Sequence, residues 1–340
     1  MRSGISEGLE GAPVGGLTPA PDDPALLDLA AALVEAGGGS VIAILLYGSH
    51  LQESAPSRWS AYDFLVIVEA YRPFYRSLAA KRLQRRPPWL LTALSFYLPP
   101  NIISFDPGRP DGAIAKCVVF HRSHFRRALR RHAPDHFLKG RVAQQIALVW
   151  SKGDEERSVV METVRKARED IPRWVRPSLP GSFELEQFAE TMLRVSYTAE
   201  IRPEHPERVT QVFRAQRDTL LEVARESLEG AVARGEVVDD SGGYRWVDPP
   251  GLGAQVSRSA YFIWSKTRAT ARWMKYVFTF DSWLDYIQKK VERRAGLKIE
   301  VEEKERRWPL LFLWPKFFRV LRAVREASSE PASEGEEPLA

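Results

Sequence analysis

The sequence predicts a mixed α/β fold, in which a sheet with covering helices is followed by a mainly helical second part. Two apolar runs of strand length lie at 41–47 and 62–68, and a third lies at 114–120. Over residues 154–170 and 183–234, apolar residues recur at helical spacing with few breakers. Turn residues at 239–243 then join two short strand-like runs, which predicts a late hairpin.

The chain is expected to open with a flexible tail and a capped helix. Residues 1–24 are rich in Gly and Pro, carry several acids, and lack the basic and apolar regions of a signal peptide. A helix is predicted over 24–36, where six apolar residues follow helical spacing. These residues are Leu26, Leu27, Leu29, Ala30, Leu33 and Val34.

Composition shifts predict five segments. The expected order is a disordered tail (1–24), a sheet-containing domain (25–150), a helical domain with a late hairpin (151–255), a C-terminal helical region (256–325) and an acidic disordered tail (326–340). Within them we expect a very basic helix over 122–133, helical periodicity over 154–170 and 183–234, and a loop between two helices over 197–206.

Composition also sets outer bounds on the protein. The chain has 340 residues, of which 44% are apolar and 27% charged, so it can bury a full core. Its one cysteine, Cys117, lies in an apolar run and excludes an intramolecular disulfide, which suits a reducing compartment. The six histidines show no convincing metal-ligand spacing.

No apolar stretch reaches the ~20 residues needed to cross a bilayer. The nearest, Trp89 to Leu98, is shorter and ends in Pro99-Pro100. We therefore expect a cytoplasmic protein that is peripheral to the inner face of the membrane, with no signal peptide and no transmembrane helix.

The most informative motif is Tyr47-Gly48-Ser49, followed fourteen residues after Ser49 by Asp63 in a second apolar run. Gly48 lets the backbone approach a phosphate closely, and Ser49 adds a hydroxyl and is expected to open a helix. A strand-borne carboxylate such as Asp63 suits Mg²⁺, which keeps waters and substrate phosphates in its coordination shell. The pattern is typical of a nucleotidyltransferase-type mixed sheet that holds a nucleoside triphosphate and Mg²⁺.

Such motifs commonly have two acids on alternate residues, but the position paired with Asp63 is Ala61. Three interpretations remain open at this point. The chain is an inactive homologue, or the metal is held by Asp63 and an acid from elsewhere, or a chance Gly-Ser lies between two buried strands.

Further blocks resemble one known family. Residues 195–202 (Val-Ser-Tyr-Thr-Ala-Glu-Ile-Arg) and 206–209 (Pro-Glu-Arg-Val) resemble the Leu-Ser-Tyr-Ser/Thr-Gly-Asp-Phe-Arg and Lys-Val blocks of the mitochondrial-type phosphatidate cytidylyltransferases. These are peripheral CDP-diacylglycerol synthases of the nucleotidyltransferase superfamily. Their Tyr-Gly-Ser-Gly is similar to residues 47–49, and their apolar-Asp-Phe is similar to residues 62–64, where the position of Ala61 is often not acidic.

Shorter blocks in the same order extend this resemblance over most of residues 40–275. They are 115–119 (Lys-Tyr-Gly-Val in the family), 137–141 (Tyr-x-Ala-Gly-Arg), the 236–247 hairpin and 265–270 (Ser-x-x-Arg-x-Ser). There are departures as well. The family's Gly-Asp is Ala199-Glu200 here, its basic residue after Gly-Arg is replaced around Gln144-Gln145, and its Trp-His and His-Tyr-Ser elements have no clear counterpart. The chain would be a divergent, bacterial-like member.

The resemblance implies a phosphatidate cytidylyltransferase of phospholipid biosynthesis, which converts CTP and phosphatidate into CDP-diacylglycerol and pyrophosphate with Mg²⁺ as cofactor. Its implied catalytic residues are Asp63, which is also the metal ligand, Lys116 and Glu200, the candidate for a second acid. The implied nucleotide-binding residues are Tyr47, Gly48, Ser49, Arg141, Ser196, Tyr197 and Arg202. The implied phosphatidate-binding residues are Arg208, Ser265 and Arg268.

Two basic features bear on partners. The basic cluster around 122–141 and the formal net charge of +5 are features of some nucleic-acid-binding proteins. No known nucleic-acid-binding module accompanies them, so nucleic acid is not expected as a partner. Residues 306–322 mix Trp, Phe and Leu with Arg and Lys, which is typical of a helix lying in the headgroup layer of an anionic membrane, and residues 273–290 extend this character. A core helix or a dimer interface is the alternative interpretation of this segment.

Two other functions remain as alternatives. One is a nucleotidyltransferase acting on a small hydroxylated molecule, a protein or an RNA end. The other is a catalytically inactive binding protein with a nucleotidyltransferase fold.

Overall fold

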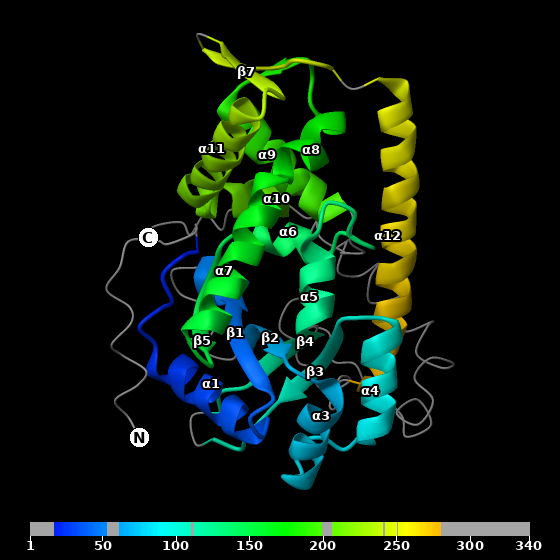
Figure 1. Cartoon of the computed structure of the whole chain (residues 1–340). Coiled ribbons are helices and arrows are strands. Elements are labelled where there is room, and N and C mark those ends of the chain that lie inside the picture. Colours follow the sequence, from blue (N-terminus) through cyan, green and yellow to red (C-terminus); the bar gives the residue numbers. More distant parts are fainter. Residues whose placement is uncertain are drawn as a thin grey trace, which may run out of the picture.

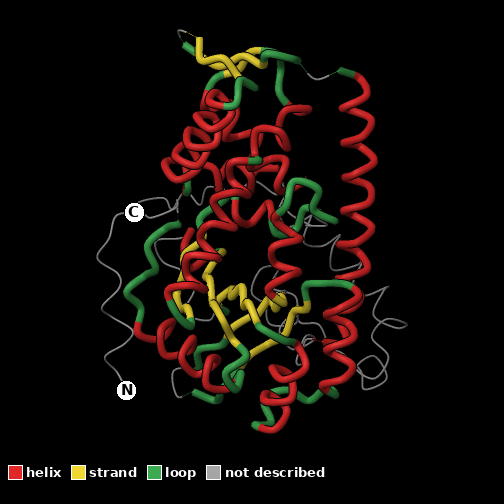
Figure 2. Tube along the Cα trace, in the orientation of Figure 1, coloured by secondary structure: helices red, strands yellow, loops and turns green. Residues whose placement is uncertain are grey.

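A computed structural model describes residues 17–52, 61–109, 112–198, 206–240, 242–249 and 251–279. A five-stranded mixed sheet lies between helices, and further helices and a small three-stranded sheet follow it (Figure 1). The mixed α/β class expected from the sequence is confirmed. Figure 2 shows the strands of the larger sheet gathered in one block with helices around it.

The larger sheet has the order β3-β4-β2-β1-β5. Its strands are β1 (Val41–Tyr47), β2 (Tyr62–Val68), β3 (Asn101–Phe105), β4 (Ala115–His121) and β5 (Ile146–Ser151). β2 and β4 are parallel, and the other neighbouring pairs are antiparallel. The three strands expected at 41–47, 62–68 and 114–120 are present, and β3 and β5 complete the sheet at its two edges.

Both faces of this sheet are covered, because apolar residues occupy both alternating sets of strand positions. One set, including Ile44, Phe64 and Cys117, packs against α1 (Pro24–Ala36), α3 (Tyr71–Ala80) and α4 (Pro88–Tyr97). The other set, including Leu45 and Phe120, packs against α5 (Arg122–Leu129) and α7 (Asp154–Glu169).

The first helix, predicted over 24–36, has these bounds because Asp23 caps it. The Asp23 carboxylate accepts a hydrogen bond from the Ala25 backbone N–H at 3.0 Å, and Pro24 opens the helix. By contrast, the basic helix expected over 122–133 ends earlier, at Leu129. Arg130 adopts an extended conformation there and ends the helical hydrogen bonding.

A third core belongs to the helical part. It is built by α8 (Ile171–Val175), α9 (Leu185–Thr198), α10 (Pro206–Ala215) and α11 (Arg217–Ala233), together with β6 (Ser182–Phe183), β7 (Val237–Asp240) and β8 (Gly243–Trp246). The expected late hairpin is β7–β8. The remaining elements are α2 (Ser49–Gln52), α6 (Lys139–Val142), the 3-10 helix η1 (Arg176–Ser178) and α12 (Leu252–Thr279).

The loop expected over 197–206 is shorter in the structure at both ends. Tyr197, expected in a loop, still belongs to α9, and Pro206 already opens α10. Residues 199–205 of that loop and the segments 1–16 and 280–340 lie outside the described residues, and so does the expected docking segment at 306–322. α12 runs along one side of the molecule (Figure 1).

Candidate functional site

The residues of the Gly-Ser motif and Asp63 meet at one end of the larger sheet. β1 ends at Tyr47, which is the register partner of Asp63 near the start of β2. Asp63 is in turn the register partner of Lys116 on the parallel strand β4. Three neighbouring strands therefore bring Tyr47, Asp63 and Lys116 side by side, although they are far apart in the sequence.

Asp63 and Lys116 form an ion pair at this end of the sheet. The Lys116 Nζ donates to the Asp63 Oδ1 at 3.2 Å, and the Lys116 and Asp63 side chains are 33% and 24% exposed, respectively. Because the carboxylate is partly exposed, it can reach a ligand in solvent. The pair therefore presents both an oxygen ligand for a metal and a positive charge for a phosphate.

Gly48 makes this arrangement possible in two ways. Its φ of +85° lies in the left-handed region that L side chains disfavour. In addition, a Cβ at this position would lie 2.7 Å from the Asp63 Oδ2, which is too close for any real contact. The chain then turns directly into α2 at Ser49, a helix of one turn. Glycine is required here both by backbone conformation and by the approach of the carboxylate.

Tyr47 and Arg141 lie beside Asp63 at this end of the sheet and contact each other. The Arg141 guanidinium lies 5.4 Å from the ring centre of Tyr47 and 4.8 Å from that of Phe137. Burial raises the pKa of the Tyr47 hydroxyl, and the negative charge of Asp63 raises it further. Tyr47 is therefore neutral and can serve as a hydrogen-bond donor at neutral pH. The structure thus brings together Tyr47, Gly48, Ser49, Asp63, Lys116 and Arg141 of the residues expected from the sequence.

Ser196 lies elsewhere, in the contact between α6 and α9. Its hydroxyl donates to the Leu193 carbonyl at 2.7 Å and accepts from the Gln144 side-chain amide at 3.4 Å. A Cβ at Gly140 would lie 3.1 Å from the Ser196 Cβ, so the Gly-Arg turn packs directly against this serine. In this conformation its hydroxyl is engaged within the protein. Its predicted role with the nucleotide stays a prediction, as does that of the half-buried Tyr197.

Ser265 and Arg268 belong to a second cluster, on α12. The Arg268 Nε donates to the Asp135 Oδ2 at 2.9 Å, and an Arg272 terminal nitrogen donates to the same oxygen at 2.6 Å. Ser265 accepts from the His136 backbone N–H at 3.2 Å. Burial alone would raise the pKa of Asp135, but the two guanidiniums outweigh it and hold the pKa below its usual value.

His136 extends this cluster and was not singled out from the sequence. The indole N–H of Trp174 donates to its Nδ1 at 3.1 Å. An indole nitrogen only donates, so Nδ1 must accept, and the proton sits on Nε2, which donates to the Val195 carbonyl at 3.0 Å. His136 is therefore a neutral, fully buried connector between α8, α9 and the segment before α6. In the sequence, only its position next to Asp135 distinguishes His136. Its role follows from tertiary contacts with Trp174 and Val195.

Phe137 links the two clusters. The guanidinium of Arg141 lies over its ring on the side of the sheet end, and the guanidinium of Arg272 lies 5.1 Å from the same ring centre. For three of the other expected residues, the structure describes no side-chain position. Glu200 and Arg202 lie outside the described residues, and the Arg208 side chain on α10 does as well.

The described residues contain no group of three or more His, Cys, Asp or Glu side chains that could hold a metal ion. Asp63 offers one carboxylate, and Ala61 beside it is buried. Mg²⁺ commonly binds through one or two carboxylates and completes its shell with water and substrate phosphates. The residues at the sheet end therefore fit a metal that arrives with a nucleotide, and they do not fit one held by protein side chains alone.

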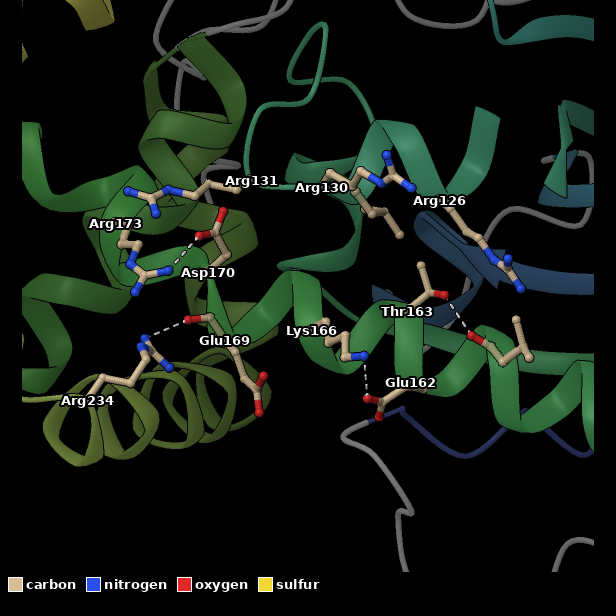
Figure 3. Close-up of a pocket in the computed structure, with 12 residues that line it drawn as sticks. Arg126, Arg130, Arg131, Glu162, Thr163, Lys166, Glu169, Asp170, Arg173 and Arg234 are labelled. Atoms are coloured by element: carbon tan, nitrogen blue, oxygen red, sulfur yellow. Dashed lines mark hydrogen bonds and ion pairs between the residues drawn. The ribbon is translucent and has the colours of Figure 1, made fainter. Parts of the chain in front are cut away.

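Two cavities lie away from Asp63. One of about 610 Å³ separates α5 from α7, and Figure 3 shows its charged lining. Another of about 120 Å³ lies where the end of α4 meets α5 and α12, with Arg127, Asp135 and Arg268 in its wall. Neither cavity is lined by Asp63, Gly48 or Lys116. In the described part of the chain, no helix is both long enough and apolar enough to cross a membrane.

Comparison of the chain with protein-family models and with curated proteins returned no match. A functional assignment therefore depends on the residues and their geometry.

Proposed function

We propose that this chain is a magnesium-dependent nucleotidyltransferase that transfers the cytidylyl group of CTP to phosphatidate at a membrane surface. The products are CDP-diacylglycerol and pyrophosphate. The observation that carries the proposal is the strand register that brings Gly48, Asp63 and Lys116 to one end of a mixed sheet. A close backbone approach, a carboxylate and a cation are what a metal-bound triphosphate requires.

The reaction is an in-line displacement at phosphorus. A phosphatidate oxygen forms a bond to the α-phosphorus of CTP, and the bond from that phosphorus to the bridging oxygen of the β-phosphate breaks. The electron pair leaves with pyrophosphate. A phosphomonoester has a second pKa of about 6, so the attacking oxygen is mostly ionised at neutral pH and needs no strong general base. This chemistry tolerates Ala61 where transfer to a hydroxyl would profit from a second carboxylate.

The protein's part is positioning and charge neutralisation. The Gly48 backbone and the Ser49 hydroxyl would bind the β- and γ-phosphates, and Asp63 would hold Mg²⁺, which when bound neutralises charge on the triphosphate and the leaving group. Lys116 would bind a phosphate oxygen while its bond to Asp63 holds that carboxylate in place. Arg141, stacked on Tyr47, would supply a second cation.

A lipid acceptor is supported by an exposed apolar surface on α4. Trp89, Phe96 and Tyr97 are 69%, 63% and 81% exposed, although α4 is strongly apolar. Trp89 and Phe96 lie two turns apart on one helix face, and exposed Arg85 and Arg86 precede the helix. Aromatic residues beside arginines are typical of a surface that sits among lipid headgroups.

The 120 Å³ cavity adjoins this surface, since Phe96 and Tyr97 form part of its wall together with Arg127 and Arg268. Arg268 is the residue expected to bind the phosphatidate headgroup. A cavity lined by Arg127 and by the Arg268–Asp135 ion pair, at the edge of an apolar helix, suits a lipid phosphate whose acyl chains remain in the membrane.

The test uses radiolabelled CTP, phosphatidate vesicles and Mg²⁺, with labelled product scored in the organic phase. We expect product from the wild-type protein and a loss of at least about a hundredfold with Asp63→Asn, because one preorganised charge is removed from the transition state. Asp218→Asn, an exposed acid at the start of α11, is the matched control and should keep the wild-type rate. Wild-type turnover by Asp63→Asn would rule out the assignment of Asp63.

A second candidate is a nucleotide-binding protein without transferase activity. It is favoured by one observation, that the alternate strand position beside Asp63 is Ala61 and the Asp63 carboxylate is paired with Lys116. Mg²⁺-dependent CTP binding without release of pyrophosphate, with phosphatidate or with hydroxyl acceptors, would establish this candidate in place of the first.

A further inference from the structure

The cleft between α5 and α7 has the size of a ligand site, and none of the residues proposed for catalysis lines it. Its volume of about 610 Å³ lies within the range of about 300–1,000 Å³ typical of small-molecule pockets. Six basic and three acidic side chains line it (Figure 3). These are Arg126, Arg130, Arg131, Lys166, Arg173 and Arg234, and Glu162, Glu169 and Asp170.

The acids of the cleft are already neutralised by neighbouring cations. Glu162 binds Arg165 at 2.7 Å and Lys166 at 3.1 Å, and Glu169 also pairs with Arg165. Asp170 accepts from the buried Nζ of Lys139 at 3.0 Å. The acids of α7 therefore contribute little negative charge to the cavity itself.

Three arginines on the opposite wall are not neutralised in this way. Arg126, Arg130 and Arg131 are exposed, and no acid in the described ranges forms an ion pair with any of them. The position of Arg131 is held by its carbonyl, which accepts a hydrogen bond from the Lys139 Nζ at 3.1 Å. The cavity thus has an excess of positive charge, and the backbone at Arg131 is held in place by Lys139.

Clustering these charges has a cost. Arg126 lies in the last turn of α5, and Arg130 and Arg131 follow directly after the helix, so their like charges repel one another. The C-terminal end of α5 compensates part of this, because helix C-termini favour cations. Arg173 and Arg234 enter the same cleft from other elements, but both form ion pairs with Glu236. A bound anion would therefore relieve the repulsion among Arg126, Arg130 and Arg131.

We propose that the cleft between α5 and α7 binds a soluble anion that carries two or more phosphate groups. Arginine forks match phosphate oxygens, and cations spread along a cleft of this size match several phosphates better than one. A membrane surface fits less well, since none of the large apolar side chains exposed in the described chain lies on α5 or α7. The proposal is independent of the function proposed for the sheet end.

The test measures binding of inorganic tripolyphosphate to the full chain by titration calorimetry, with EDTA present to remove divalent metals. We expect one site in the wild-type protein and at least a tenfold weaker affinity with Arg130→Gln, since that variant removes charge-assisted hydrogen bonds to the phosphate oxygens. Arg76→Gln is the matched control, because it removes an exposed arginine on α3 that lines neither this cleft nor the smaller cavity. Its affinity should stay within twofold of wild type.

Two further variants locate the site. Lys116→Gln should leave tripolyphosphate binding intact, and Arg126→Gln should weaken it as Arg130→Gln does. The proposal is overturned if the wild-type protein does not bind, if Arg76→Gln and Arg130→Gln weaken binding equally, or if Lys116→Gln abolishes binding while Arg130→Gln leaves it unchanged. Inorganic phosphate serves as the single-phosphate arm and should bind at least tenfold more weakly. Equal affinity for it would contradict a multiphosphate ligand.

Discussion

Gly48 shows how one residue can link backbone conformation to chemistry. Its left-handed φ ends β1 sharply, and its missing Cβ leaves room for the Asp63 Oδ2 at the position where the carboxylate meets Lys116. A side chain there would have to push the carboxylate away, because the backbone on both strands is fixed by the register. The geometry of the candidate site thus requires a residue without a Cβ atom at position 48.

We therefore expect Gly48→Ala to lower the free energy of unfolding by about 1–2 kcal/mol, the cost of a left-handed L-residue, and to abolish CTP binding. Gly39→Ala is the matched control. Gly39 also has a positive φ, of +78°, but a Cβ at Gly39 would meet no other atom within 4 Å. Urea unfolding should show similar losses for both, whereas nucleotide binding should fail only for Gly48→Ala. Equal binding by both variants would separate Gly48 from the site.

Asp135 carries the second residue-scale prediction. Its pKa is held below the usual value of about 3.9 by Arg272 and Arg268. A carboxylate with a lowered pKa contributes stability that is fully present above its unfolded pKa and is lost as the pH falls through the folded pKa. Asp135→Asn should therefore destabilise the protein by about 3–5 kcal/mol at pH 7.

The measurement is the free energy of unfolding in urea between pH 7 and about pH 2. The difference between wild type and Asp135→Asn should shrink as the pH falls below about 4, because the wild-type carboxylate then loses its charge as well. Asp218→Asn, an exposed acid, should show a small effect. A difference that stays constant across this pH range would mean that the ion pairs do not supply the stability.

At the scale of elements, α12 differs from an ordinary surface helix. Polar residues at helical spacing are buried or half-buried along it, namely Ser265, Arg268, Arg272, Lys275 and Thr279. Each finds a partner in the body of the protein. The Lys275 Nζ donates to the carbonyls of Leu98 and Pro100 at 2.5 Å each, and Thr279 donates to the Ile102 carbonyl at 3.0 Å. Burial, together with the nearby arginines, holds the pKa of Lys275 well below its usual value.

The α4 surface carries the element-scale prediction. Trp89→Ser should weaken binding to phosphatidate-containing vesicles about tenfold, which corresponds to about 1.4 kcal/mol and is within the range for burying one large apolar side chain. Val247→Ser is the control, since Val247 is 54% exposed but lies after the β7–β8 hairpin. Vesicle sedimentation measures both. Equal effects of the two variants would mean that α4 is not the docking surface.

At the scale of the whole molecule, positive charge and exposed aromatic residues should act together on a membrane. The formal net charge is +5, and the exposed residues Arg85 and Arg86 lie directly before α4. Each basic residue near an anionic surface contributes about 1 kcal/mol, and salt screens this attraction.

Vesicle binding should therefore fall at least tenfold between about 0.05 M and about 0.5 M NaCl for vesicles containing phosphatidate. Neutral phosphatidylcholine vesicles are the control and should show a weaker, nearly salt-independent association driven by the aromatic residues of α4. Salt-independent binding to both kinds of vesicle would show that charge does not contribute to docking.

Much of the fold could be predicted from local pattern. β1, β2 and α1 have the expected bounds because a continuous apolar run or a capped amphipathic run is sufficient to define them. β3 and β5 were not foreseen. Each becomes a strand by pairing with a neighbour already in the sheet, and a short apolar run alone does not distinguish a strand from a buried helix segment.

The sequence by itself determined the α/β class, the motif Gly48-Ser49 with Asp63, and the late hairpin, because these depend on neighbouring residues and their periodicity. Tertiary structure alone decided that Lys116 meets Asp63, that Arg141 stacks on Tyr47, and that α12 buries its charged side. The physical reason is that register and burial are set by partners distant in sequence. In the sequence, the cations of α12 indicate a solvated or membrane-facing surface. In the structure Arg268 is half-buried and Lys275 is buried, because Arg268 binds the Asp135 carboxylate and Lys275 binds carbonyls that follow α4.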